Sequence, residues 1–171
     1  MPADRQYLEF FSDMNDFVKG YVDDYNGDGE INLGIDTIYL NSTDEYRSDI
    51  ASNRQRVRNA LASGTCMCVI ADTAGFEYLA STGLLQDISY LVDDTYFDGK
   101  AYRLNDSEVA SAAMGLDNAG PLYIGLRAYY GTYAQIQKKQ TAYFTMAEKM
   151  LKMISDPDFD PETDAVPTPE D

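Results

Sequence analysis

The run CMCVIAD at positions 66–72 constrains the fold more than any other part of the sequence. It is short and almost wholly apolar, which is typical of a strand that is covered on both faces. A capping-box pattern predicts a helix over 42–64 before it. A shorter helix is predicted over 74–82 after it, with Asp72 or Thr73 as its cap. A buried strand between two helices indicates helices packed on a sheet.

The rest of the chain repeats this alternation. A helix is predicted over about 4–23, where apolar residues recur every three or four positions, and a β-branched strand follows at 31–40. A third strand is predicted at 121–130 and a long helix at 132–154, while residues 93–119 are mixed and rich in turns. Helices that alternate with strands predict an α/β fold with parallel strand pairing and right-handed crossovers.

The chain has 171 residues, enough for one domain with a substantial core. We predict a single α/β domain over 1–155. The segment 156–171 holds four prolines and seven acidic residues, so we predict a disordered, acidic, Pro-rich tail there. The sequence begins inside the first predicted helix, whereas a strand usually precedes that helix in such a sheet. The sheet is therefore expected either to have lost its first strand or to be smaller than usual.

The net charge of the chain limits the classes of partner that it can bind. It carries 29 acidic and 13 basic residues, a net charge of -16. Such a surface repels phosphate backbones and anionic lipid headgroups, so no nucleic-acid partner is expected. It suits cation binding and solubility outside a cell. No run of eighteen apolar residues occurs, so we expect no membrane-spanning segment in this sequence.

The side chains that most often carry catalysis or transition metals are scarce. The sequence has no histidine, which removes the usual general base near neutral pH and the commonest transition-metal ligand. Its two cysteines, Cys66 and Cys68, have a spacing that suits a disulfide badly and offer too few ligands for a metal. They are predicted to be small buried side chains.

The acidic stretch DDYNGDGEIN at 23–32 has two interpretations. An EF-hand-type calcium loop needs oxygen ligands at its first, third and fifth positions, glycine at the sixth and a bidentate acid at the twelfth. The front half fits this pattern, but Ile35 stands at the twelfth position. The alternative is a tight turn between a helix and a strand, which Asn-Gly and Asp-Gly favour. The residues predicted to bind calcium, if any is bound, are Asp24, Asn26, Asp28, Glu30 and Asp36.

A candidate ligand site follows the buried strand. Asp72 ends that strand, at the place where α/β sheets usually bind ligands. Asp72, Thr73 and Glu77 are therefore predicted to form a small polar site. The alternative is that Asp72 and Thr73 only cap the next helix.

The third predicted strand carries an aromatic face. Alternation along PLYIGLRAYY sends Tyr123, Gly125, Arg127 and Tyr129 to one side of the sheet. An aromatic face with one arginine suits contact with a sugar, a peptide or a partner protein. The alternative is that a neighbouring helix covers it. Arg127 and Tyr129 complete the predicted ligand-binding set.

The run from Tyr39 to Ser89 resembles the first lobe of the extracellular solute-binding proteins of ABC transporters. In that family a helix ends in a turn like Ala60–Gly64, a buried strand like Val69–Asp72 follows, and a helix of the Glu77–Ile88 type comes next. Those proteins have two lobes, whereas this chain has room for one, so it is most similar to small single-lobe lipoproteins of Gram-positive bacteria. The resemblance implies a small three-layer α/β sandwich like one lobe of a periplasmic-binding protein, with or without its first strand.

The resemblance also implies an extracellular protein that is anchored to the membrane through an upstream segment. We expect a non-enzymatic protein that binds a small-molecule ligand or a cell-envelope protein, with calcium as its candidate cofactor. The alternative is a structural or interaction module of a cell-envelope complex that does not bind solutes. A third alternative, a small hydrolase that uses carboxylates, has support only from the abundance of acidic residues.

Overall fold

A computed structural model gives the structure of the chain. It describes residues 12, 13, 15, 16, 19, 22, 24, 27–31, 34, 36, 38, 40, 49–129 and 138–167. These residues form a mixed helix and strand structure with a small antiparallel sheet, consistent with a small α/β fold.

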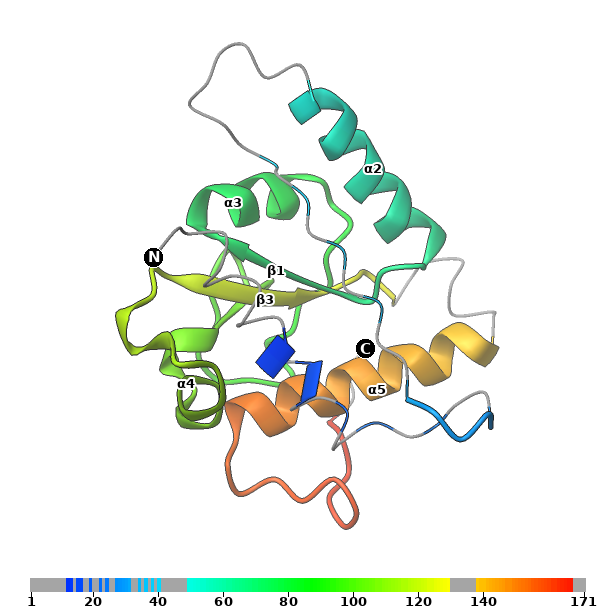
Figure 1. Cartoon of the computed structure of the whole chain (residues 1–171), viewed down its shortest axis with the longest axis vertical. Coiled ribbons are helices and arrows are strands. Elements are labelled where there is room, and N and C mark those ends of the chain that lie inside the picture. The colour runs from blue at the N-terminus through cyan, green and yellow to red at the C-terminus, as the bar shows by residue number, and fades with distance from the viewer. Residues whose placement is uncertain are drawn as a thin grey trace.

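The sheet has three described strands in the order β1-β3-β2 (Figure 1). They are β1 (Cys68–Asp72), β2 (Tyr102–Arg103) and β3 (Leu122–Leu126). Both pairings are antiparallel, so the prediction of parallel strand pairing was wrong. Because β1 and β2 each run against β3, they run in the same direction as each other on either side of it.

The central strand β3 sends its side chains to two hydrophobic clusters. Ile124 and Leu126 belong to a cluster that includes Phe144 and Leu151, here named the α5 cluster. Tyr123 belongs to a second cluster, here named the α3 cluster. The buried members that define the α3 cluster are Leu40, Val57, Leu61, Phe76, Leu79, Leu85, Ala101 and Tyr123. The two-residue period of a strand therefore divides the core between the two faces of the sheet.

Four helices of the described ranges contribute to the core: α2 (Asp49–Ser63), α3 (Thr73–Ser81), α4 (Glu108–Met114) and α5 (Lys138–Ser155). Residues outside the helices and strands, such as Ile88 and Leu91, are also buried in it. In Figure 1, α2 and α3 lie on one side of the sheet, and α4 and α5 lie on the other. None of the helices in the described ranges is both long and apolar enough to cross a membrane.

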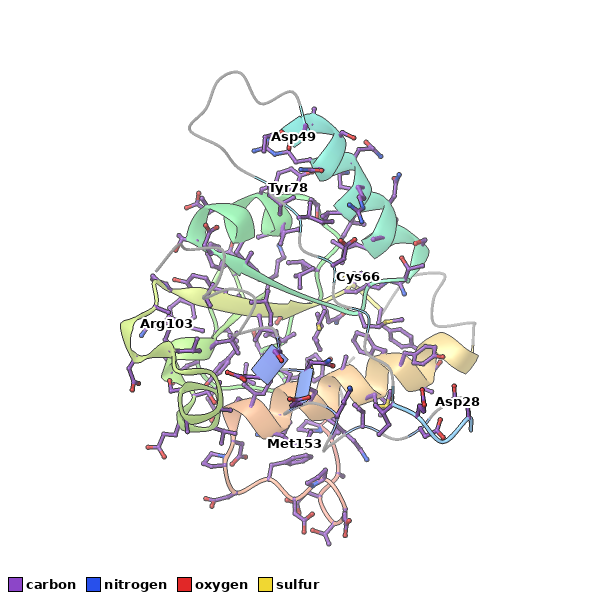
Figure 2. All side chains as sticks on the ribbon, viewed as in Figure 1. Asp28, Asp49, Cys66, Tyr78, Arg103 and Met153 are labelled. Atoms are coloured by element: carbon purple, nitrogen blue, oxygen red, sulfur yellow. The ribbon has the colours of Figure 1, made fainter. Side chains whose placement is uncertain are left out.

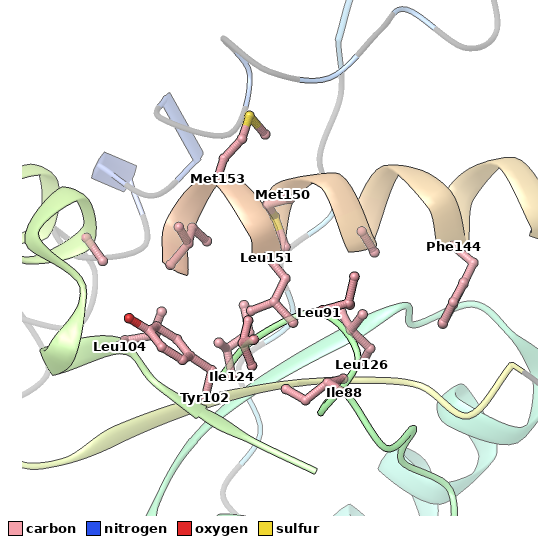
Figure 3. Packing of buried hydrophobic residues seen from close by; sticks show 14 of the residues in the cluster. Ile88, Leu91, Tyr102, Leu104, Ile124, Leu126, Phe144, Met150, Leu151 and Met153 are labelled. Atoms are coloured by element: carbon pink, nitrogen blue, oxygen red, sulfur yellow. The ribbon is translucent and has the colours of Figure 1, made fainter. Parts of the chain in front are cut away.

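Helix α5 packs on the sheet through its apolar face. Leu151 is fully buried and points toward β3, the strand that carries Ile124 and Leu126 (Figure 3). Met153 leaves the same helix on the side away from the sheet (Figure 3) and is also buried. The sequence predicts an inward face of five residues on this helix: Tyr143, Ala147, Met150, Leu151 and Ile154. Four of them are buried, whereas Tyr143 is exposed, so its prediction was wrong.

The strand and helix predicted around positions 66–82 are confirmed, but β1 is half-buried and not covered on both faces as predicted. The apolar run forms β1, and the helix predicted over 74–82 is α3. An Asp72 Oδ1 atom accepts a hydrogen bond of 2.7 Å from the Gly75 amide, which makes Asp72 the N-cap of α3. Residues 93–119 hold β2, α4 and two 3-10 helices, Leu104–Asp106 and Leu116–Asn118, none of which was predicted.

Several predicted elements extend outside the described residues. The first helix falls mostly there, although its described residues 12, 13, 15, 16 and 19 are helical. The strand predicted at 31–40 also falls partly there, and its described positions carry no strand. The start of the helix over 42–64 and of the helix over 132–154 lie outside the described ranges as well.

The described part of the acidic tail contacts the body of the protein. Phe159 and Val166 are partly buried against the α5 cluster. The Lys149 ammonium donates a hydrogen bond of 3.4 Å to the Pro161 carbonyl, and the Asp164 amide donates one of 2.8 Å to the Asp160 carbonyl. The prediction of a disordered tail over 156–171 did not anticipate these contacts.

Candidate functional site

The antiparallel sheet divides the predicted ligand-binding residues into two groups. Asp72 lies opposite Leu122, at the end of the sheet where β3 begins. The Arg127 amide donates a hydrogen bond of 2.9 Å to the Met67 carbonyl, beyond the other end of β1. A five-residue strand spans about 16 Å, so Asp72 and Arg127 do not share a site. The single site that parallel pairing would have produced does not form.

A different arginine lies at the Asp72 end of the sheet. Arg103 ends β2 and is opposite Tyr123, which is in turn opposite Ala71 of β1. Because β1 and β2 run in the same direction, their carboxyl ends meet at this edge. Two strand spacings separate them, about 10 Å. We name this place the β1–β2 carboxyl edge and define it by Asp72, Thr73, Tyr96, Arg103, Asp106 and Tyr123.

The β1 side of this edge is polar and exposed. Asp72 caps α3 through one carboxylate oxygen and its side chain stays accessible. Thr73 is the first residue of α3 and Glu77 follows one turn later, and both are exposed. The capping alternative for Asp72 is therefore confirmed, while a ligand contact at these three residues remains a prediction.

The β2 side of the edge carries a paired arginine. The Arg103 Nε atom lies 2.9 Å from both Asp106 carboxylate oxygens, and the Arg103 guanidinium stands 5.5 Å from the centroid of the Tyr96 ring. The Tyr96 hydroxyl donates a hydrogen bond of 3.2 Å to Asp106. The Asp106 carboxylate raises the pKa of Arg103, since its hydrogen bonds favour the charged guanidinium.

These residues were missed because the segment around them has no helical or strand period. The one available signal was the arginine-to-aspartate spacing of three residues, Arg103 to Asp106. A two-residue strand that runs into a 3-10 helix is too short to give a hydrophobic pattern. Figure 2 shows Arg103 at the periphery of the molecule, near α4.

Aromatic rings fill the space beneath the edge. The Tyr123 ring makes an edge contact with Phe97, with 4.9 Å between centroids, and another with Tyr96 at 5.5 Å. Phe76 of α3 completes the group, 5.0 Å from Phe97 and 6.0 Å from Tyr123. Tyr123 is thus covered by neighbouring side chains, one of them from helix α3. This agrees with the alternative prediction that the aromatic face is covered and not open for binding.

Arg127 and Tyr129 are buried at the other end of the sheet. The Tyr129 hydroxyl lies 2.6 Å from the Thr141 hydroxyl, and the Tyr129 ring stacks on Phe144 at 4.5 Å. Tyr129 therefore packs in the α5 cluster, whereas Tyr123 packs in the α3 cluster. The predicted common face of the two tyrosines was wrong, because β3 ends at Leu126 and its alternation does not continue to Tyr129.

The two cysteines lie next to this end and are free thiols. Cys66 precedes β1 and packs with the α3 cluster, while Cys68 begins β1 and packs with the α5 cluster. The Cys66 thiol donates to the Cys68 carbonyl at 3.1 Å. Burial raises the pKa of both thiols, that of Cys68 to about 12, so neither is a reactive thiolate near neutral pH.

The acidic loop has the hydrogen bonds of a folded turn. The Asp24 carboxylate accepts from the Gly27 amide at 2.8 Å and from the Gly29 amide at 2.7 Å, and the Glu30 amide donates to Asp28 at 2.8 Å. Gly27 and Gly29 have φ of 72° and 84°, which glycine adopts without strain.

Asp36, another predicted calcium ligand, is engaged elsewhere. Asp36 forms an ion pair with Arg56 of α2, both side chains being more than half exposed. Asn26 lies outside the described residues. Within the described ranges no three acidic, histidine or cysteine side chains gather as a metal site would require. Figure 2 shows Asp28 far from Arg103, so the loop and the β1–β2 carboxyl edge are separate places.

Comparison of the chain with protein-family models, curated proteins and solved structures finds no match in any of the three. The function is therefore inferred from the geometry of the described residues and from the resemblance in the sequence. The β1–β2 carboxyl edge is the candidate site, because the end of β1 carries an exposed carboxylate and an exposed hydroxyl, and the end of β2 carries an arginine over the Tyr96 ring.

Proposed function

We propose that this protein is a non-enzymatic binding protein, similar to one lobe of an extracellular solute-binding protein, and that it takes a small polar ligand at the β1–β2 carboxyl edge. One observation carries the proposal: Asp72 and Arg103 end two strands that run in the same direction, on either side of Tyr123. In α/β sheets the crevice outside the carboxyl ends of the strands is the usual ligand site.

The chemistry of the edge favours a sugar or a short peptide. The strands that end in Asp72 and Arg103 are separated by two strand spacings, about 10 Å, which is on the order of the span of one monosaccharide or dipeptide. Asp72 and Thr73 offer oxygen atoms to hydroxyl or amino groups. Arg103 offers nitrogen donors to hydroxyl or carboxylate oxygens on the far side.

The carboxylates of this edge support binding over catalysis. Asp106 is neutralised by Arg103, and Asp72 is engaged as a helix cap. A hydrolase would instead need a carboxyl group whose environment shifts its proton affinity toward the working pH. Both carboxylates are already held by hydrogen bonds, which either group would have to give up before it could transfer a proton to a substrate.

The proposal draws on the three local pieces of sequence that carry the resemblance. The turn Ala60–Gly64 ends α2, the strand Val69–Asp72 is part of β1, and the Glu77–Ile88 segment begins in α3. With α2 and α3 on one side of the sheet and α4 and α5 on the other, a three-layer sandwich like one lobe is our proposal for the whole domain (Figure 1).

A thermal-shift screen tests the ligand site. The panel contains monosaccharides, disaccharides, amino acids and dipeptides at millimolar concentration. A ligand that binds the folded state raises Tm, by roughly 2–4 °C for each kcal/mol that binding adds to the free energy of unfolding in a chain of this size. Arg103→Gln and Asp72→Asn should abolish the shift, since Asn keeps the cap but removes the charge.

The control is Arg58→Gln, an exposed arginine of α2 away from the edge. It should leave the shift intact. The proposal fails if no compound in the panel raises Tm, or if a hit is insensitive to both edge variants.

We also propose a structural calcium ion at the acidic loop. The hydrogen bonds from Gly27 and Gly29 orient the Asp24 carboxylate as the first position of an EF-hand-type loop requires, and Asp28 supplies the fifth position. Affinity in the millimolar range predicts a rise in Tm of about 3 °C in 10 mM calcium. Magnesium and an Asp28→Ala variant, which lacks the side-chain oxygen ligand, should show no rise, while Asp158→Ala in the tail should behave like the wild type. Equal shifts with both metals would refute the site.

The proposed location is extracellular, with anchoring through an upstream segment. The net charge of -16 and the resemblance to lipoproteins support it. Protease added to intact cells should remove the protein without lysis. Protection until lysis would contradict this location.

The second candidate is a structural or interaction module of a cell-envelope complex that binds no solute. Among the described strands β1 pairs only with β3, so its other edge is the place where a partner strand would add. Native mass spectrometry of the protein released gently from its own envelope should then show a defined complex. A monomer that responds to the ligand panel would decide for the first candidate.

A further inference from the structure

The turn at 96–101 has an unusual backbone. Phe97, Asp98 and Gly99 all have positive φ, at 52°, 55° and 82°. Glycine tolerates this region, whereas a bulky side chain such as phenylalanine rarely adopts it. Three successive left-handed residues form a strained segment unless other contacts stabilise it.

Hydrogen bonds close the turn at its base. The Tyr96 amide donates to the Ala101 carbonyl at 2.8 Å, and the Ala101 amide donates back to Tyr96 at 3.1 Å. The tip of the turn is also held, because the Ile88 amide donates to the Gly99 carbonyl at 2.7 Å. Gly99 fits closely here: a Cβ atom on it would stand 2.7 Å from the side-chain oxygens of Asp87 and Ser89.

Aromatic contacts hold the strained part. The Phe97 ring lies 5.0 Å from Phe76 and 4.9 Å from Tyr123, between α3 and β3. The Tyr96 ring contacts Tyr123 at 5.5 Å and its hydroxyl reaches Asp106. The closed turn therefore covers Tyr123, which is only 8% exposed. Lifting the turn would uncover this ring at the β1–β2 carboxyl edge.

We propose that the turn 96–101 is a flap with two states. The Phe97 ring holds it closed on Tyr123, and the backbone of Phe97 and Asp98 favours release. In the open state Tyr123 is accessible and Tyr96 no longer stands beside Arg103. The opening itself follows from strain and packing. Only the use of the open flap as a ligand entrance to the β1–β2 carboxyl edge rests on the proposed function.

Amide hydrogen exchange of the ligand-free protein tests the flap. The amides of Ile88, Lys100 and Ala101 are bonded within or to the turn and should exchange together. The Arg127 amide, bonded to Met67 in the sheet, is the reference and should exchange at least tenfold more slowly. Phe97→Ala should speed exchange of the three turn amides about tenfold, because the ring contacts are lost. Phe97→Leu should give a smaller increase.

Asp98→Gly separates strain from packing. Glycine adopts φ of 55° without strain, so this variant should slow exchange of the three amides about threefold. Asp93→Gly, at an exposed position outside the turn, is the matched control and should not slow them. The proposal is overturned if the turn amides exchange with Arg127 in one cooperative step, or if Asp98→Gly does not slow them. Because no ligand is present, the outcome is independent of the ligand screen.

Discussion

Gly125 of β3 lies directly against the ring of Phe76 from α3. A Cβ atom on Gly125 would stand 2.7 Å from the Phe76 Cζ atom and 2.6 Å from the Lys100 carbonyl oxygen. The helix and the turn that carry these atoms approach the sheet closely because this one strand position has no side chain.

Gly125→Ala should therefore destabilise the protein by about 1–3 kcal/mol, since the added methyl group overpacks the contacts with the Phe76 ring and with the Lys100 carbonyl of the closed turn. Urea denaturation followed by circular dichroism measures the free energy of unfolding. Gly120→Ala is the matched control, because a Cβ atom there meets nothing within 4 Å. Equal stabilities of the two variants would contradict the close packing at Gly125.

Asp72→Ala should lower the free energy of unfolding by about 1 kcal/mol, because the Gly75 amide loses its hydrogen-bond acceptor at the start of α3. Asp72→Asn should lower the free energy of unfolding by only about a few tenths of a kcal/mol, since asparagine caps nearly as well. Thermal denaturation of the two variants side by side makes the comparison. If asparagine and alanine are equally harmful, the charge of Asp72 matters and the cap does not.

Leu151→Ala should destabilise the protein by about 2–5 kcal/mol, since it opens a cavity at a fully buried position between α5 and the sheet. Thr145→Ala, at an exposed position of the same helix, should change stability by less than about 0.5 kcal/mol. Chemical denaturation measures both. A small loss for Leu151→Ala would mean that α5 does not depend on this contact.

The raised pKa of Cys68, a half-buried residue, predicts a loss of stability in alkali. Its pKa is about 12 in the folded protein against an ordinary value of 9.0, so above pH 9 the unfolded chain releases a proton that the folded chain keeps. Stability that is fully present below pH 9 should therefore fall as the pH rises toward 12, by up to about 1.4 kcal/mol per pH unit.

Cys68→Ala isolates this effect from the other groups that titrate in alkali. The free energy of unfolding measured between pH 8 and 11 should fall less steeply in Cys68→Ala than in the wild type. At neutral pH a thiol reagent should react slowly with the folded protein and quickly after unfolding. Parallel pH profiles of the two proteins would show that Cys68 is not protected by the fold.

The sequence predicts best where the signal is local. The run at 66–72 and the cap at Asp72 are confirmed because an apolar strand, a capping side chain and the helix after them are all encoded within a few neighbouring residues. The direction of strand pairing was predicted wrongly. It depends on β3, which follows β1 after about fifty residues of chain, and no local pattern records which way a distant strand will run.

The prediction of the site residues was right in part and wrong in part, and both outcomes depend on how clearly each strand is marked in the sequence. Asp72 was found because it ends a recognisable strand, whereas Arg103 was missed because β2 has only two residues. Arg127 and Tyr129 were assigned to the site by continuing a strand alternation beyond Leu126, where the strand had ended. The true neighbours of Asp72 at the edge come from a segment without periodicity, so only the folded arrangement brings them together.

The insertion of β3 between β1 and β2 also sets an order of events during synthesis. A ribosome extends the chain by about 5–20 residues per second, so several seconds pass between the synthesis of β1 and that of β3, the central strand with which both β1 and β2 pair. During that interval the apolar run CVIAD has no described partner in the sheet. The nascent chain thus carries an unpaired, aggregation-prone strand edge until Leu126 emerges, which makes the speed of translation through residues 73–126 a determinant of folding yield.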